Sequence, residues 1–234
     1  MTKTCDNILI ITEALRMKFE AAADENYAKG MKAYMRNISD FYGVTSPRRK
    51  EILSQIKAET GFPVAGLMDE FLKYAWMQPQ REWQYAAMEM MAPAAGKGDT
   101  ALLTTAEYMI TGKSWWDTVD YIASNIVGQL LKKNKGEITA VIEKWLKTDN
   151  HWLWRTALLF QLKYGSNTDE KLLFGLCEQL ASEQDFFIRK GIGWALRQYS
   201  KYNPEAVTVF VNTHTLSALS RKEALKVIER AKTF

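Results

Sequence analysis

Cysteine, histidine and proline are scarce in this chain of 234 residues, and it contains no long apolar run and no glycine-rich phosphate loop. Cys5 and Cys177 are too few for a disulfide framework, and with His151 and His214 they form no recognisable metal-ligand cluster. Neither histidine has a local acid or nucleophile partner, so a hydrolase triad gains no support. The longest aliphatic run near the start, residues 8–11, is far too short for a membrane span, and no secretory leader pattern is present. We therefore expect a cytoplasmic protein without a metal site.

The rest of the composition is that of a folded protein, with 47% hydrophobic and 25% charged residues. All five prolines lie at or near expected helix starts or loops, and between them apolar residues recur at three- and four-residue spacing. In residues 117–131 this stripe consists of Val119, Ile122, Ile126 and Leu130. Residues 152–164 nearly repeat it with Trp154, Ala157, Leu158, Gln161 and Leu162. No alternating strand pattern competes, so the sequence predicts an all-α fold.

Aromatic-led helix openings recur along the chain, at residues 82–86, 114–117, 152–155 and 186–189. A helical segment at residues 220–224 follows them. Arg155 and Arg189 are 34 residues apart, and Arg189 and Lys222 are 33 apart. Spacing in the mid-thirties is typical of stacked helical hairpins, and the tetratricopeptide consensus is absent. We therefore predict a HEAT-like helical-repeat solenoid that forms one domain over residues 1–234.

Positive charge is concentrated in the second half of the chain. Residues 1–110 contain 13 lysines and arginines against 14 acidic residues, whereas residues 111–234 contain 18 against 13. A concave solenoid face lined by the basic residues of the last repeats would suit a phosphate backbone, with an affinity that falls steeply with salt. These residues are Arg189, Lys190, Arg197, Arg221 and Lys222. The lysines of residues 132–135 are instead expected at the C-terminal end of a helix.

The segment 113–120 is the most unusual part of the sequence. Ser114 is expected to cap a helix, and Asp117 falls in the first turn, where a carboxylate meets the free amides. Trp115 is expected on the core-facing stripe, whereas Trp116 and Asp120 are four residues apart and share a face that points away from the core. An exposed indole beside a carboxylate is consistent with a catalytic pair, and equally with an interface residue beside a surface charge.

Arg155 and Trp194 are the next candidates for a functional role. Arg155 opens a helix between bulky aromatic residues, where its guanidinium can reach a phosphate or a carboxylate in bidentate fashion, or simply cover apolar surface. Trp194 lies among small residues, Gly191 and Gly193 included, that would let another backbone or a ligand come close. Core packing explains Trp194 equally well.

Three long motifs carry a family resemblance: residues 113–120, 149–157 and 186–197 resemble the AlkD family of DNA alkylation repair glycosylases. The segments 34–37 and 43–49 are similar to the family's N-terminal signature, and residues 219–224 to its C-terminal one. Together these motifs span roughly residues 30 to 230.

The resemblance implies a HEAT-like solenoid that binds duplex DNA on a concave basic face, acts as a monomer without a cofactor, and removes cationic N3- and N7-alkylated purines. It makes Asp120 the catalytic carboxylate, Trp116 and Trp194 the residues that flank the sugar, and Arg155 a DNA contact. Tyr34 and Thr45 are expected as further DNA contacts, although Thr45 stands where some members have a longer polar side chain.

Two other classes remain open from the sequence. A non-catalytic DNA-binding paralogue that recognises distorted or branched DNA would bind without releasing a base. A HEAT-type protein-interaction scaffold would be indifferent to DNA. The presence of both Trp116 and Asp120 favours the enzyme over either alternative.

Overall fold

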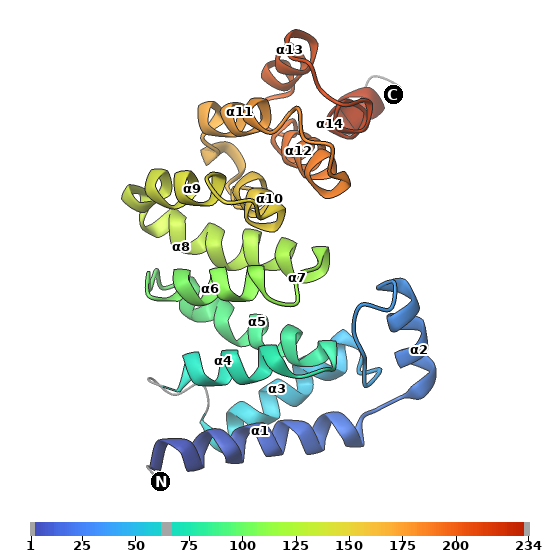
Figure 1. Cartoon of the computed structure of the whole chain (residues 1–234), viewed down its shortest axis with the longest axis vertical. Coiled ribbons are helices and arrows are strands. Elements are labelled where there is room, and N and C mark those ends of the chain that lie inside the picture. Colours follow the sequence, from blue (N-terminus) through green and yellow to red (C-terminus); the bar gives the residue numbers. More distant parts are fainter. Residues whose placement is uncertain (1–2, 62–66, 232–234) are drawn as a thin grey trace. The chain divides into compact units, whose positions relative to one another are not determined.

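The computed structural model describes residues 3–61 and 67–231, and in these residues every regular element is a helix (Figure 1). The one bridge between extended residues in this part of the chain pairs Asp40 with Gln80. The predicted all-α class is confirmed. None of the helices in the described ranges combines the length and the apolar character that a membrane crossing requires.

The chain divides into two compact units, residues 1–94 and 95–234, and each is described by itself. The first unit contains helices α1 (Lys3–Ala21), α2 (Glu25–Tyr34), α3 (Ser46–Thr60), α4 (Met68–Met77) and α5 (Arg81–Ala95). Helix α1 packs against α3 and α4. Phe19 and Trp83 meet edge to face in this core, with ring centroids 5.6 Å apart.

Over residues 95–231 the second unit contains nine α-helices and three short segments of other helical type, and neighbours along the chain pack on one another (Figure 1). The first half consists of α6 (Leu102–Thr111), α7 (Trp116–Tyr121), η1 (Ile122–Val127), α8 (Gly128–Lys133), η2 (Lys135–Glu137) and α9 (Ile138–Leu146). The second half consists of α10 (His151–Leu159), η3 (Gly165–Asn167), α11 (Glu170–Gln179), α12 (Phe186–Tyr199), α13 (Pro204–Thr213) and α14 (Ala218–Ala231). Helix α7 packs on α10, α10 on α12, and α12 most extensively on α14. The single-domain solenoid stays a prediction.

Local sequence explains most helix boundaries in the second unit. Asn150 and Asp185 cap α10 and α12 with their side chains, which accept backbone N–H groups of the first turn. The predicted cap at Ser114 is wrong: its hydroxyl donates to the carbonyl of Ile110 at 2.6 Å, and α7 begins at Trp116. Because this hydroxyl is bonded to the last turn of α6, it does not cap α7.

The first predicted apolar stripe is confirmed, since Val119, Ile122, Ile126 and Leu130 are fully buried. The second predicted stripe is confirmed within α10, where Ala157 and Leu158 are buried, and is wrong beyond it. Helix α10 ends at Leu159, and Gln161 lies in the following turn, where its side chain accepts the amide of Asp169 at 2.8 Å.

Between α7 and α8 the chain forms a π-helix, η1, over residues 122–127. Ser124 Oγ donates to the carbonyl of Asp120 at 2.9 Å, and Asn125 Nδ2 donates to that of Tyr121 at 3.0 Å. These side chains satisfy carbonyls at the point where the helical register changes. Segments of this kind are frequent at functional sites, and this one begins two residues after Asp120.

Gly128 follows η1 and lies against the end of α10. A Cβ at this position would meet the carbonyl oxygen of Phe160 at 2.3 Å, and this carbonyl belongs to backbone that cannot rotate away. Gly128→Ala should therefore lower the free energy of unfolding by about 1–3 kcal/mol through overpacking. Urea denaturation measures the change. Gly175→Ala is the matched control, because nothing lies within 4 Å of its Cβ, and equal effects at both positions would contradict the prediction.

Candidate functional site

Helix α7 carries two of the predicted site residues one turn apart. Trp116 is its first residue and is half-buried, and Asp120 follows four residues later on the same face. Asp117 lies in the first turn, as predicted for a carboxylate near a helix N-terminus. The helix is short because the π-segment begins at Ile122.

Asp120 and Arg155 form a buried ion pair between α7 and α10. Arg155 Nε donates to Asp120 Oδ1 at 2.7 Å and Nη2 donates to Oδ2 at 2.9 Å, while Nη1 donates to the carbonyl of Phe187 in α12. The side chains are only 12% and 4% exposed. The face of α7 that the sequence suggested would point to solvent is thus covered by the next helix, and Asp120 is not a free surface charge.

The position of the Arg155 guanidinium depends on a glycine in α12. A Cβ at Gly191 would lie 3.2 Å from Arg155 Nη1 and 3.4 Å from a methyl of Leu158. The small residue therefore gives the guanidinium room between α10 and α12. The sequence predicted that a backbone or a ligand would come close here, and the group that does so in the structure is the side chain of Arg155.

Burial and pairing with Arg155 shift the pKa of the Asp120 carboxyl in opposite directions. Desolvation raises its pKa above the ordinary value and is the largest cause, the hydrogen bonds and charge of Arg155 oppose the rise, and the charge of Asp117 adds to it. Both Asp120 oxygens accept hydrogen bonds from the guanidinium, so the group is an anion in this arrangement. Arg155 is what keeps a buried carboxylate charged.

An aromatic cluster lies beside the ion pair. The Trp115 ring lies 5.2 Å from that of Phe187 and 6.1 Å from that of Trp152, and Trp152 and Phe187 are 4.9 Å apart between centroids. Within the described residues the buried Trp115 Nε1 has no hydrogen-bond partner. Trp115, the residue before α7, therefore packs against aromatic rings of α10 and α12, whereas the sequence predicted only a place on the stripe of its own helix. Phe187 belongs to the aromatic-led opening at residues 186–189, but nothing in the sequence predicts that its carbonyl accepts from Arg155.

Trp194 lies seven residues after Phe187, on the same face of α12 and about 10 Å further along its axis. Its side chain is half-buried. The glycine before it meets α14: a Cβ at Gly193 would lie 2.6 Å from Glu223 Cβ and 2.9 Å from the carbonyl of Ser220. Gly191 therefore lets side chains of α10 approach α12, and Gly193 lets α14 approach it.

Most of the predicted DNA-binding cations of the second unit make internal contacts. Arg189 Nε donates to the carbonyl of Glu183, and its guanidinium also contacts the side chain of Gln184. Arg221 donates to the carbonyl of Val211 and to the Asn212 side chain, both at 2.7 Å. Lys190 and Arg197 share one carboxylate, and Lys222 is exposed. Direct contacts of these residues and of Arg155 with DNA stay predictions.

Tyr34 and Thr45 belong to the first unit. Tyr34 ends α2 and is 73% exposed, and Thr45 is the residue before α3. The loop that leads to Thr45 is held by the buried carboxylate of Glu82, which accepts the amides of Tyr42, Gly43 and Val44 at 2.9–3.1 Å. Burial raises the pKa of Glu82, and these hydrogen bonds counteract the rise. No pattern in the sequence predicts this anchor.

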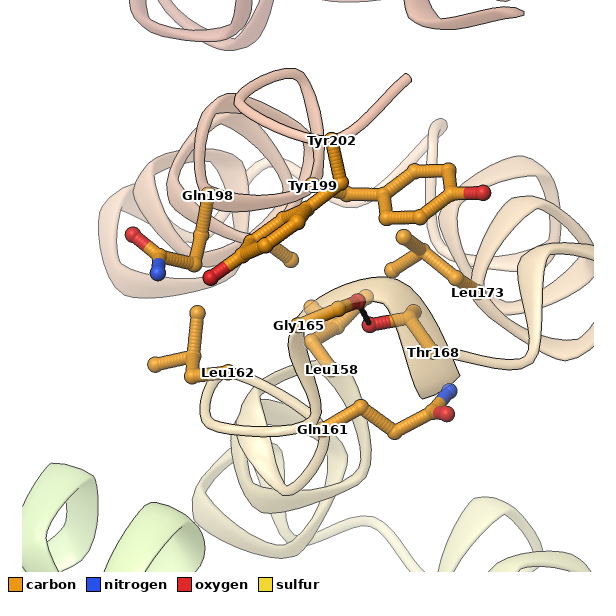
Figure 2. Close-up of a pocket in the computed structure, with 10 residues that line it drawn as sticks. Leu158, Gln161, Leu162, Gly165, Thr168, Leu173, Gln198, Tyr199 and Tyr202 are labelled. Atoms are coloured by element: carbon orange, nitrogen blue, oxygen red, sulfur yellow. Dashed lines mark hydrogen bonds between the residues drawn. The ribbon is translucent and has the colours of Figure 1, made fainter.

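A small cavity lies between α10, α12 and η3, lined by polar and apolar side chains (Figure 2). Its volume of about 10 Å³ is space for roughly one water molecule. In Figure 2, Tyr199 and Tyr202 lie opposite Leu158, Leu162 and Gly165. None of the predicted catalytic residues lines it. Across the described ranges no group of three His, Cys, Asp or Glu side chains is placed to hold a metal ion.

The fold and the site define an all-α protein whose candidate centre is a buried carboxylate–guanidinium pair between α7 and α10. One tryptophan lies a turn before the carboxylate, and a second lies on α12, which packs on α10. The chain belongs to the DNA alkylation repair enzyme family, whose model matches residues 15–228. This confirms the resemblance that the sequence motifs indicated.

Solved structures agree with this assignment. A predicted DNA alkylation repair enzyme from Enterococcus faecalis is 27% identical, with a TM-score of 0.80 over 87% of this chain and 95% of that one. The smu.31 protein and AlkD2, both from Streptococcus mutans, are each 18% identical with TM-scores of 0.56. They cover 79% of this chain and 92% and 89% of their own, and show a shared fold. No curated protein matches the sequence.

Proposed function

We propose that this protein is a monofunctional DNA glycosylase that excises cationic N3- and N7-alkylated purines from duplex DNA, as a monomer and without a metal or cofactor. The observation that carries the proposal is the Asp120 carboxylate, which is buried, held charged by Arg155 and located one turn from Trp116. Membership of the repair family supports it. Duplex DNA that contains alkylated bases is the proposed partner, and the cytoplasm the proposed location.

The chemistry needs no general acid. An N7-alkylated purine is already a cation, so the C1′–N bond breaks with its electron pair going to the base, which leaves neutral, and the sugar becomes oxocarbenium-like. A water then attacks C1′ and gives up its proton, leaving an abasic site. Asp120 stabilises the positive sugar and orients or deprotonates the water. A carboxylate has about four lone-pair sites, and Arg155 uses one on each oxygen, so the others remain for this role.

The size of the effect has an upper bound. A carboxylate about 4 Å from a unit positive charge, at an effective dielectric near 20, attracts it by about 4 kcal/mol. That corresponds to roughly a thousandfold in rate if it is confined to the transition state. The positive charge of Arg155 opposes part of this attraction. In return, Arg155 keeps Asp120 ionised and fixes its orientation.

The two tryptophans supply the rest of the proposed site. The faces of Trp116 and Trp194 would each add on the order of 0.5–2 kcal/mol by cation–π attraction to the positive sugar or base. They would also exclude solvent from the sugar. A glycosylase that acts in this way reaches the lesion without a deep base pocket, unlike enzymes that flip the base into an enclosed site.

The test is release of 7-methylguanine from methylated duplex DNA by the purified protein. Release above the spontaneous rate supports the glycosylase. Salt-dependent binding of duplex DNA without any release would instead identify the non-catalytic DNA-binding paralogue. If the protein neither binds duplex DNA nor releases the base, the protein-interaction scaffold is the remaining alternative.

Arg221 provides a test of the DNA-binding face. Arg221→Ala should weaken duplex binding and reduce the slope of log K against log salt by about 1, because one phosphate contact is lost. Fluorescence anisotropy between 50 and 200 mM salt measures both. Lys171→Ala is the control: this exposed lysine of α11 is not among the predicted contacts. An unchanged slope in Arg221→Ala would remove Arg221 from the binding face.

A further inference from the structure

Glu223 links two of the predicted DNA-binding cations. The carboxylate is 11% exposed on α14, and each of its oxygens accepts from a different side chain of α12: Oε1 from Lys190 Nζ at 2.8 Å and Oε2 from Arg197 Nη1 at 2.7 Å. The Lys190 and Arg197 side chains are 39% and 25% exposed. One buried anion thus holds together two cations that reach solvent.

The packing of α12 on α14 fixes this arrangement. Gly193 lets α14 approach so closely that a Cβ there would lie 2.6 Å from Glu223 Cβ. One turn earlier, Ser220 Oγ donates to the carbonyl of Arg189 at 2.9 Å. Both contacts lie directly beside Glu223, so the carboxylate has little freedom to move away from α12.

The two cations share a helical face with Trp194. Lys190, Trp194 and Arg197 occupy positions i, i+4 and i+7 of α12, which fall on one side of a helix. Lys190 gives one of its three N–H donors to Glu223 and Arg197 one of its five, so each keeps donors for a second anion. The two oxygens of a carboxylate are spaced much like two oxygens of a phosphate. Two cations that converge on Glu223 are therefore close enough together to converge on one phosphate as well.

We propose that Glu223 is a positioning residue for DNA binding, which holds Lys190 and Arg197 side by side so that both contact one DNA phosphate next to Trp194. The inference rests on the proposed binding of duplex DNA. Because the side chains are ordered before DNA arrives, less conformational freedom is lost on binding. The carboxylate increases DNA affinity even though its charge repels DNA.

The charge of Glu223 and its positioning of the two cations affect DNA affinity in opposite directions, so a substitution that removes the charge separates them. Glu223→Gln raises the net charge of +4 by one, so electrostatics alone predicts tighter DNA binding. Positioning predicts the reverse: binding about tenfold weaker, with a salt slope smaller by about 1, because the contact with one phosphate is lost. Glu229→Gln is the matched control, because it removes the same charge from an exposed position of the same helix. Anisotropy with a methylated duplex over a range of salt concentrations measures all three proteins.

A second variant, Glu223→Asp, tests the proposal if Glu223→Gln does not fold. It keeps the net charge of the wild type but is one methylene too short to reach both cations, so we expect a loss of affinity between those of the wild type and Glu223→Gln. Tighter binding by Glu223→Gln that equals the gain in Glu229→Gln, or wild-type affinity in Glu223→Asp, would overturn the proposal. A wild-type protein that does not bind duplex DNA would overturn the proposed function itself, which is a different result.

Discussion

Asp120→Asn should lose up to about a thousandfold in the rate of 7-methylguanine release while keeping its affinity for duplex DNA. The amide is nearly isosteric with the carboxylate but carries no charge, so it cannot stabilise the positive sugar or take a proton from water. Its oxygen can still accept one guanidinium hydrogen bond, whereas its NH₂ group faces the second donor of Arg155. Single-turnover excision kinetics with excess enzyme separate this chemical step from binding.

The control for this prediction is Asp149→Asn, which makes the same change at an exposed residue of the loop before α10. Thermal melting of both variants shows whether each is folded at the assay temperature. Excision at the wild-type rate by a folded Asp120→Asn protein would falsify the proposed role of Asp120. Equal losses of activity and affinity would mean that the carboxylate acts in DNA binding instead.

Arg155→Met should lower the free energy of unfolding by about 3–5 kcal/mol, because it leaves a buried carboxylate without its partner. Methionine is shorter than arginine but has a similar volume, so a cavity contributes little. The double variant Asp120→Asn/Arg155→Met removes both charges and should recover most of this loss, as expected for replacement of a buried ion pair by neutral groups. Urea denaturation of the four proteins gives the coupling energy directly. Additive effects would contradict the pairing.

The Arg155→Met variant should also have a characteristic pH dependence. Without the guanidinium, only burial and Asp117 act on the Asp120 carboxyl, and both raise its pKa. A carboxyl whose folded-state pKa lies above its unfolded value is destabilising in its charged form, so the loss of stability is smallest at acid pH. It grows as the pH rises from the unfolded pKa through the folded one. Unfolding free energies of variant and wild type between pH 4 and 8 test this, and a pH-independent difference would contradict it.

Patterns within one helix could be predicted from the sequence because their causes are local. The spacing of Val119, Ile122 and Ile126 identified the buried face, and the side chains of Asn150 and Asp185 mark where α10 and α12 begin. The three family motifs overlap α7, α10 and α12, the helices that carry the candidate site. Ser114 shows the limit of such reasoning, because its hydroxyl bonds to the previous helix instead of capping the next one.

Contacts between helices could not be predicted in the same way. Asp120 and Arg155 are 35 residues apart, and so their pairing depends on how α7 and α10 stack. Glu223 lies in the C-terminal motif at residues 219–224, and only the packing against Gly193 shows that it joins Lys190 to Arg197. The glycines were the one available signal, since they predicted close approach without saying what would approach.

The π-segment after Asp120 also determines where that residue points. Each residue of an α-helix advances the chain by about 100° around the axis, and a π-turn accommodates additional residues within the same helix. The apolar side chains of α8, Leu130 and Leu131, fix one end of this helix in the core. In a continuous α-helix one additional residue at this point would rotate Asp120 by about 100° about the axis and away from Arg155, and the wide turn of η1 takes up that rotation. The direction of the carboxylate therefore depends on η1 being a π-helix, and a relative that lacks one of these residues and continues as a regular α-helix would keep the pair of Asp120 with Arg155.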